Sequence, residues 1–189
     1  MLLWHLAWPA AAETVHVAVA ANFRQTLEES LAGAFRSRSG HELKISSASS
    51  GVLYNQIVHG APFHVFLSAD SERPARLEKS GHAVAGSRFT YALGQLALVY
   101  RQTLSAPAAR GPAAVIVSPG ISLVIANPEL APYGVAAQQV LERAGGPGEG
   151  ARLLRAANIS QAYQMWHSGG ADAALVARSQ VKAGYLEIP

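Results

Sequence analysis

A chain of 189 residues, half of them hydrophobic and only 14% charged, is long enough to bury one sizeable core or two smaller ones. This composition excludes a disordered chain. The formal net charge is +3 and the 15 Lys and Arg residues are dispersed, so no basic patch predicts a nucleic-acid partner. The sequence contains no cysteine, which excludes disulfides, thiolate metal sites and a cysteine nucleophile.

Residues 1–12 begin with a short apolar run and end in the small residues Pro9 to Ala12. This pattern is typical of the end of a secretory signal, although the usual basic segment is missing. Either the start is misassigned, or the segment is a buried first turn. No later stretch reaches the roughly 18 to 20 apolar residues that span a bilayer. We therefore expect an exported, soluble protein.

Strand and helix patterns alternate through the first part of the chain. Strands are predicted at 15–21, 42–47 and 64–68, and helices at 23–35, 51–59 and 72–80. Asn22 is a favoured N-cap for the first helix, with Gln25 as its capping-box partner. Three strand-helix units in succession predict a parallel sheet with right-handed crossovers.

The second part of the chain repeats this theme after a longer apolar strand. Strands are predicted at 91–100, 121–126 and 171–176, and helices at 135–144, from Asn158 onward and near Arg178. Residues 102–120 contain three prolines and little periodicity, which predicts a connector or exposed loop. A second α/β lobe is expected.

The segment Ser46 to Gly51 follows a strand pattern and precedes a helix pattern, and it contains four serines. Free backbone N–H groups and the positive end of the helix dipole favour an oxyanion at such a junction. The alternative is that Ser50 merely caps the helix and the other serines form a solvated turn.

Ligands of open parallel sheets bind beyond the carboxyl ends of the strands. Neutral donors occupy several strand-to-helix junctions or helix starts of this chain: Asn22, Ser49 or Ser50, Tyr133, and the backbone N–H groups around Ile159 and Ser160. If both lobes face one cleft, several helix N-termini converge there and can hold a dianion without Lys, Arg or a metal ion.

Several short segments carry a family resemblance through their order and spacing. They are Ala20 to Phe23, Ser49 to Gly51, Gly60 to Phe63, Leu67 to Asp70, Arg88 to Ala92, and Asn127-Pro128 with Ala131 to Gly134. Together they resemble the periplasmic molybdate-binding proteins of ABC transporters, and the resemblance covers residues 15–189.

The resemblance implies an α/β, two-lobed periplasmic binding protein fold with a mixed, mainly parallel sheet in each lobe. Residues 13–90 would form the first lobe, and 91–189 the crossover and second lobe. The implied function is capture of molybdate or tungstate in the interlobe cleft for delivery to the membrane permease of an importer. A periplasmic monomer is implied, with no cofactor, no metal other than the bound oxyanion, and no nucleic acid.

The implied oxyanion contacts fall at Asn22 with the preceding Ala21, at Ser50, at Tyr133, and at Ile159 through its backbone. Ala21 replaces a hydroxyl residue found in some members, so one side-chain donor is in doubt. A tyrosine found late in some members corresponds to Ala177, so it is absent here.

A larger departure lies at the end of the chain. Family members continue past the position of Pro189, and their tail completes the first lobe. The C-terminal part of that lobe is therefore expected to be missing, which would make the chain aggregation-prone. A truncated, inactive member is the corresponding alternative.

Two other function classes remain as alternatives. An enzyme would use Ser50 as its nucleophile, but there is no G-x-S-x-G motif and the seven histidines show no ligand-like i, i+4 pair. The ligand-sensing domain of an oxyanion-responsive regulator has a similar fold, but no helix-turn-helix segment precedes it here.

Asp70 is expected to cap a helix start rather than to face the ligand.

Overall fold

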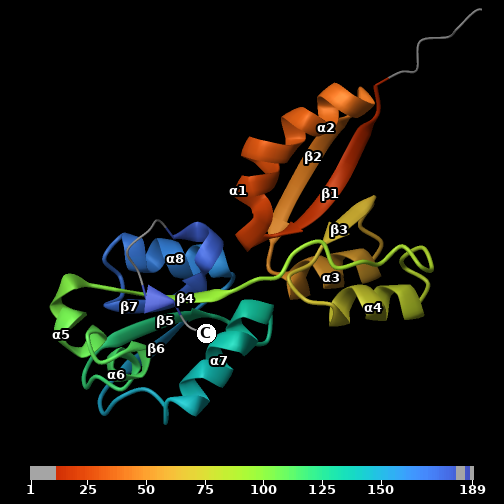
Figure 1. Cartoon of the computed structure of the whole chain (residues 1–189). Coiled ribbons are helices and arrows are strands. Elements are labelled where there is room, and N and C mark those ends of the chain that lie inside the picture. Colours follow the sequence, from red (N-terminus) through yellow and green to blue (C-terminus); the bar gives the residue numbers. More distant parts are fainter. Residues whose placement is uncertain (1–11, 182–185, 188–189) are drawn as a thin grey trace, which may run out of the picture.

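The computed structural model describes residues 12–181 and 186–187, so the signal-like segment lies outside the described residues except for Ala12. The protein forms two lobes (Figure 1). We use "first lobe" for the elements within residues 14–79 and "second lobe" for those within 96–187; residues 80–95 connect them. The boundary predicted between residues 90 and 91 falls in this connection and stays a prediction.

The first lobe is a small parallel sheet with helices on its two sides (Figure 1). Its elements are β1 (Thr14–Ala20), η1 (Ala21–Phe23), α1 (Arg24–Thr26), η2 (Leu27–Leu31), α2 (Ala32–Ser39), β2 (Glu42–Ala48), α3 (Ser50–Val58), β3 (Val65–Leu67) and α4 (Glu72–Lys79). The strand order is β2-β1-β3, and both pairings are parallel. The predicted succession of strand-helix units is confirmed.

The first helical segment departs from regular α-helical spacing. Apolar residues four apart predict one continuous buried face, yet η2 is a π-helical turn. Because a π turn is wider than an α-helical turn, residues four apart within it no longer lie on one face. Leu27 is therefore buried, whereas Leu31 is 42% exposed.

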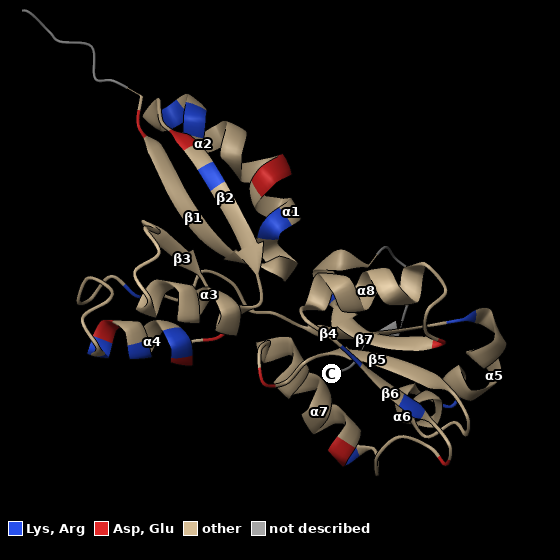
Figure 2. Cartoon of the chain, turned by 180° about the vertical axis from the view of Figure 1, so that it is seen from behind, with Lys and Arg blue, Asp and Glu red and all other residues tan. Residues whose placement is uncertain are grey.

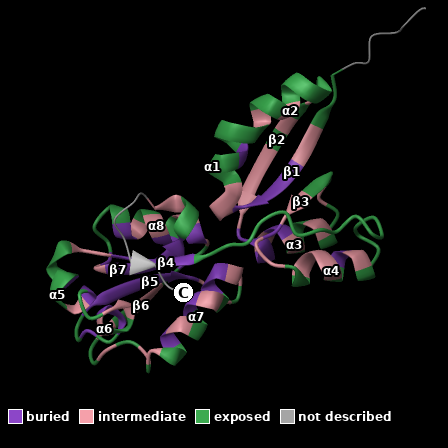
Figure 3. Ribbon diagram, viewed as in Figure 1, coloured by how far each residue is buried: buried purple, intermediate pink, exposed green. Residues whose placement is uncertain are grey.

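The second lobe is a larger mixed sheet. Its elements are β4 (Leu96–Tyr100), η3 (Gln102–Leu104), α5 (Ser105–Ala108), α6 (Pro112–Ile116), β5 (Ser122–Ala126), α7 (Pro132–Arg143), β6 (Arg152–Ala156), α8 (Ile159–His167), β7 (Ala173–Ala177), η4 (Arg178–Gln180) and β8 (Leu186–Glu187). The strand order is β6-β5-β7-β4-β8, with β4 antiparallel to both of its neighbours. β5 and β7 are buried along their whole length, and β4 is buried except at Tyr100 (Figure 3).

The prediction of a connector over 102–120 is wrong. This segment forms η3, α5 and α6, and it contributes Leu104, Val115 and Ile116 to the core of the second lobe. Pro112 stands at the first position of α6, where a missing N–H costs nothing. The helices are too short to show a period, so tertiary packing rather than local pattern forms them.

Three further elements differ from the prediction. The strand expected from Tyr91 begins only at Leu96, and β6 was not predicted at all. The helix expected near Arg178 is the short 3₁₀ turn η4, and residues 182–185 lie outside the described residues.

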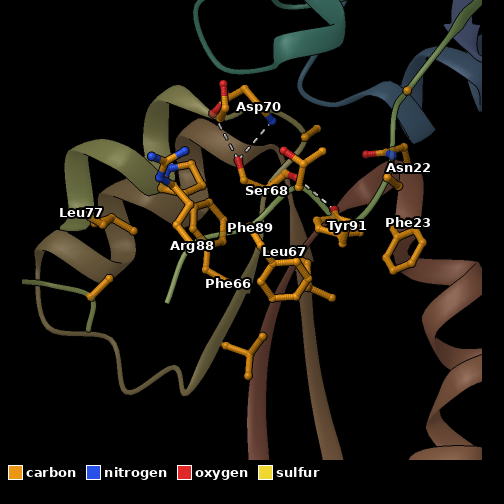
Figure 4. Close-up of a pocket in the computed structure, with 18 of the residues that line it drawn as sticks. Asn22, Phe23, Phe66, Leu67, Ser68, Asp70, Leu77, Arg88, Phe89 and Tyr91 are labelled. Carbon is orange, nitrogen blue, oxygen red and sulfur yellow. Dashed lines mark hydrogen bonds between the residues drawn. The ribbon is translucent and has the colours of Figure 1, made fainter. Parts of the chain in front are cut away.

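A large cavity of about 1020 Å³ lies beside β3, enclosed by α4 and the 80–95 connection. Figure 4 shows Phe66, Leu77 and Phe89 among its apolar lining residues, with the Tyr91 hydroxyl donating to the Ser68 carbonyl at 2.9 Å. Among the described strands, β3 is an edge of the first sheet. An apolar lining and an unpaired strand edge therefore occur together.

We expect the 189-residue chain to associate as its concentration rises, because this edge lies close to Phe89 and Leu93, which are 77% and 89% exposed. Sedimentation velocity over a concentration series measures the effect. Phe89→Ser should shift the protein toward monomer, whereas Val117→Ser, at an exposed apolar position of the second lobe, should not. A monomeric profile at every concentration would contradict the expectation.

Candidate functional site

A second, small cavity lies between the two lobes. It is lined by Ala20, Ala21, Asn22, Ser49, Ser50, Ala69, Ala131, Pro132, Tyr133, Asn158 and Ile159. Its volume is about 10 Å³, which holds about one water molecule. A larger ligand therefore enters only when the lobes separate.

Three helices begin at this cavity. Ser50, Pro132 and Ile159 are the first residues of α3, α7 and α8, and all three line the cavity wall. The first N–H groups of a helix have no partner within that helix, and its N-terminus carries a partial positive charge. Three such ends at one point favour a negatively charged occupant.

Asn22 reaches the cavity in a way that contradicts its predicted role. It lies within η1 rather than at an N-cap, and Gln25 donates to Glu29 instead of closing a capping box. The strand leads directly into a 3₁₀ turn, which moves Asn22 inside the helical segment. Its buried Oδ1 has no hydrogen-bond partner among the described residues. A carboxamide turned by 180° about its last torsion presents Nδ2, so this side chain can donate to an anion.

The Ser50 hydroxyl accepts one hydrogen bond at the cavity wall and can still donate another. Its Oγ accepts from the Ala69 N–H at 3.0 Å, and the residue is 1% exposed. A hydroxyl that accepts one bond still has its own O–H to donate. The preceding residue, Ser49, is also buried, and its Oγ has no partner within the described part of the chain.

Tyr133 supplies a phenol that stays protonated. Burial raises its pKa above the usual value, because loss of water disfavours the phenolate. Burial, together with the nearby Tyr133, raises the pKa of Tyr91 to about 12. Both hydroxyls therefore remain neutral donors at physiological pH.

Asp70 does not supply a free carboxylate to the cavity. Its Oδ1 accepts from the Arg73 N–H at 2.9 Å at the start of α4, and its Oδ2 pairs with the Arg73 guanidinium. The Ser68 hydroxyl also donates to Asp70 (Figure 4). The expectation that Asp70 caps a helix start is confirmed. All residues that line the small cavity within the described ranges are uncharged.

Charged side chains lie elsewhere on the molecule. Figure 2 shows basic and acidic residues interspersed on α4 and along the helical segment that runs from α1 to α2. In the part of the chain that the structure describes, no group of three or more His, Asp or Glu residues could hold a metal ion. The same residues include no helix long and apolar enough to cross a membrane.

Comparison with known protein families identifies the family to which this chain belongs. The model of the bacterial extracellular solute-binding protein family matches residues 15–188. The chain belongs to this family. Its curated relatives include the molybdate-binding protein ModA of Azotobacter vinelandii, 43% identical over 178 residues that make up 93% of this chain and 69% of the relative. ModA of Rhodobacter capsulatus is 42% identical over 187 residues, or 95% of this chain and 70% of that protein.

The solved structures agree with the fold of this solute-binding protein. The periplasmic molybdate-binding protein of Azotobacter vinelandii superposes with a TM-score of 0.77 at 36% identity, over 93% of this chain and 79% of that one. The predicted resemblance and the predicted two-lobed α/β fold are thus confirmed. The sheets differ in detail, since all pairings described in the first lobe are parallel and only the second sheet is mixed.

The structure brings all five residues of the predicted site to one cavity of the solute-binding protein, namely Ala21, Asn22, Ser50, Tyr133 and Ile159. Ala177, which replaces a tyrosine, is buried at the end of β7 and does not line it. Sequence reasoning left Ser49 undecided. It placed Asn158 at the start of a helix, where its Oδ1 caps α8 by accepting from the Gln161 N–H, but it did not assign Asn158 to the site. The contact between Ala69 and Ser50 has no local signal, because it joins residues 19 apart.

Proposed function

We propose that the protein captures molybdate, with tungstate as the closest competitor, in the cavity between its lobes and presents it to the permease of an ABC importer. The observation that carries the proposal is the convergence of three helix N-termini and several neutral donors on one uncharged cavity. The names of relatives at 42–43% identity support the choice of anion.

The site residues have separate roles in this proposal. Asn22, Ser50 and Tyr133 donate through side chains, while Ala21 and Ile159 contribute backbone groups. A hydrogen bond to a charged group contributes about 1.5 to 3 kcal/mol, so a handful reaches the roughly 8 to 12 kcal/mol of micromolar to nanomolar affinity. No bond in the anion is broken, and the protein acts as a periplasmic carrier rather than as an enzyme.

Selectivity follows from the lack of a carboxylate at the small cavity. Near neutral pH phosphate keeps a proton, and burying that proton without a carboxylate to accept its hydrogen bond costs about 1 to 3 kcal/mol. Molybdate, tungstate and sulfate carry no proton. We therefore expect the affinity for each of them to exceed the affinity for phosphate by about 10-fold or more. The engagement of Asp70 by Arg73 and Ser68 supports this expectation.

Calorimetric titration with molybdate, tungstate, sulfate and phosphate tests the proposal. We expect binding without turnover, with phosphate weakest. No heat with molybdate, tungstate or sulfate would overturn the function. Displacement of molybdate by phosphate at equal concentration would overturn only the selectivity, because it would require an acceptor facing the ligand.

A further inference from the structure

Two linked hydrogen bonds connect η4 to α8, and α8 to the first lobe, beside the small cavity. Gln180 Nε2 in η4 donates to Ser160 Oγ at 2.6 Å, and Ser160 Oγ donates to the Ala21 carbonyl at 3.0 Å. Ser160 is the second residue of α8, in the second lobe, whereas Ala21 begins η1 in the first. The bond between them spans 139 residues of sequence.

The direction of both bonds is fixed by chemistry. A carbonyl oxygen only accepts, so Ser160 must give its single proton to Ala21 and can only accept from Gln180. Gln180 must therefore present Nε2, which leaves its buried Oε1 without a partner among the described residues. An unpaired buried oxygen is unfavourable, and the side chain keeps this orientation because Ser160 needs a donor.

These two hydrogen bonds also orient a peptide of the proposed anion site. Ala21, Asn22 and Ile159 line the cavity, and Ser160 does not. The peptide bond between Ala21 and Asn22 is trans and planar, so its C=O and N–H point in opposite directions. Holding the Ala21 carbonyl on Ser160 therefore sets the direction of the Asn22 N–H.

We propose that Ser160, oriented by Gln180, is a positioning residue that joins the lobes at Ala21 and aligns the Ala21–Asn22 peptide for the anion. The Ser160 hydroxyl does not donate to the ligand and acts through the Ala21 carbonyl. The proposal rests on the proposed function for its effect on affinity, and on the interlobe bond alone for its effect on the lobes.

Calorimetry with molybdate compares the parent with Ser160→Ala, Ser160→Thr, Gln180→Ala and the double alanine variant. Ser160→Ala should weaken binding about 5- to 10-fold, the loss typical of one hydrogen bond, while the ligand-free melting temperature changes little. Ser160→Thr keeps the hydroxyl and should bind like the parent. The double variant should bind no more weakly than Ser160→Ala, because Gln180 acts through Ser160.

Ser168→Ala is the matched control. Ser168 directly follows α8, and within the described residues its hydroxyl donates only to the Met165 carbonyl, at 3.2 Å. Its affinity should equal that of the parent. Parent-like affinity in Ser160→Ala, or a Gln180→Ala loss that adds fully to that of Ser160→Ala, would overturn the proposal.

A ligand-free measurement separates this proposal from the proposed function. The chain has no cysteine, so spin labels can be placed at Arg38→Cys in α2 and Gln139→Cys in α7, both at exposed positions of different lobes. Electron–electron resonance should show a broader interlobe distance distribution in Ser160→Ala than in the parent. If the parent binds no oxyanion, the proposed function fails, and an unchanged distribution would then overturn the positioning role as well.

Discussion

Gly51→Ala is expected to weaken anion binding by about 10- to 100-fold, because the added methyl group overpacks the contact between the lobes. An ideal Cβ at this position would lie 2.7 Å from the Leu130 carbonyl oxygen and 3.2 Å from the Leu130 Cα. Both atoms belong to backbone and cannot rotate aside. The Gly51 N–H donates to that same oxygen at 2.9 Å, so the lobes could no longer approach to this distance.

The ligand-free fold should tolerate the change. Gly51 is the second residue of α3, where alanine is the better helix former. Calorimetry and thermal melting measure affinity and stability separately. Gly33→Ala in α2 is the matched control, because no neighbouring atom lies within 4 Å of its ideal Cβ. Parent-like affinity in Gly51→Ala would show that closure does not need this contact.

Asn22→Ala and Ser50→Ala should both weaken molybdate binding by about 10- to 100-fold, but only the second should destabilise the fold. The Asn22 Oδ1 has no partner in the described structure, so its removal breaks no bond of the ligand-free protein. Ser50 accepts from the Ala69 N–H, and its removal leaves that group unpaired in a buried site. We therefore expect Ser50→Ala to lower the melting temperature by roughly 2 to 10 °C.

Ser37→Ala is a suitable control in the same lobe, since its exposed hydroxyl donates to the Gly33 carbonyl away from the cavity. Titration and melting of the three variants give the comparison. If Asn22→Ala and Ser50→Ala both melt earlier yet bind as tightly as the parent, these side chains serve the fold alone, and the cavity is not the binding site.

Regular local patterns predicted most of the first lobe and the elements around the site. Apolar periodicity marks β1, β2, α3 and α8. Distinct ends also helped, such as Gly40, which ends α2 at a φ of 74°. The site residues came from these junctions together with the family resemblance. The parallel pairing of the first-lobe strands also followed, because successive strand-helix units return the chain in the same direction. The strand order was not predicted.

Features that depend on distant contacts could not be predicted in the same way. Residues 102–116 show no period, and burial against β4 and β5 decides their helices. The π turn at Leu27–Leu31 leaves Leu27 buried and Leu31 exposed, and no residue in this segment signals a π turn. The bond from Ser160 to Ala21 joins residues 139 apart, and no local signal marks either partner.

The division of the cavity between two lobes has a consequence for release of the proposed anion. Ala21, Asn22 and Ser50 belong to one lobe, and Tyr133 and Ile159 to the other. Such a site is a bivalent receptor, in which the second half binds at the high effective concentration created by the first. When the lobes part, each half alone holds the anion weakly, and it leaves with its own chemistry unchanged. A transporter that pulls the lobes apart would therefore convert a tight carrier into a donor by mechanical means.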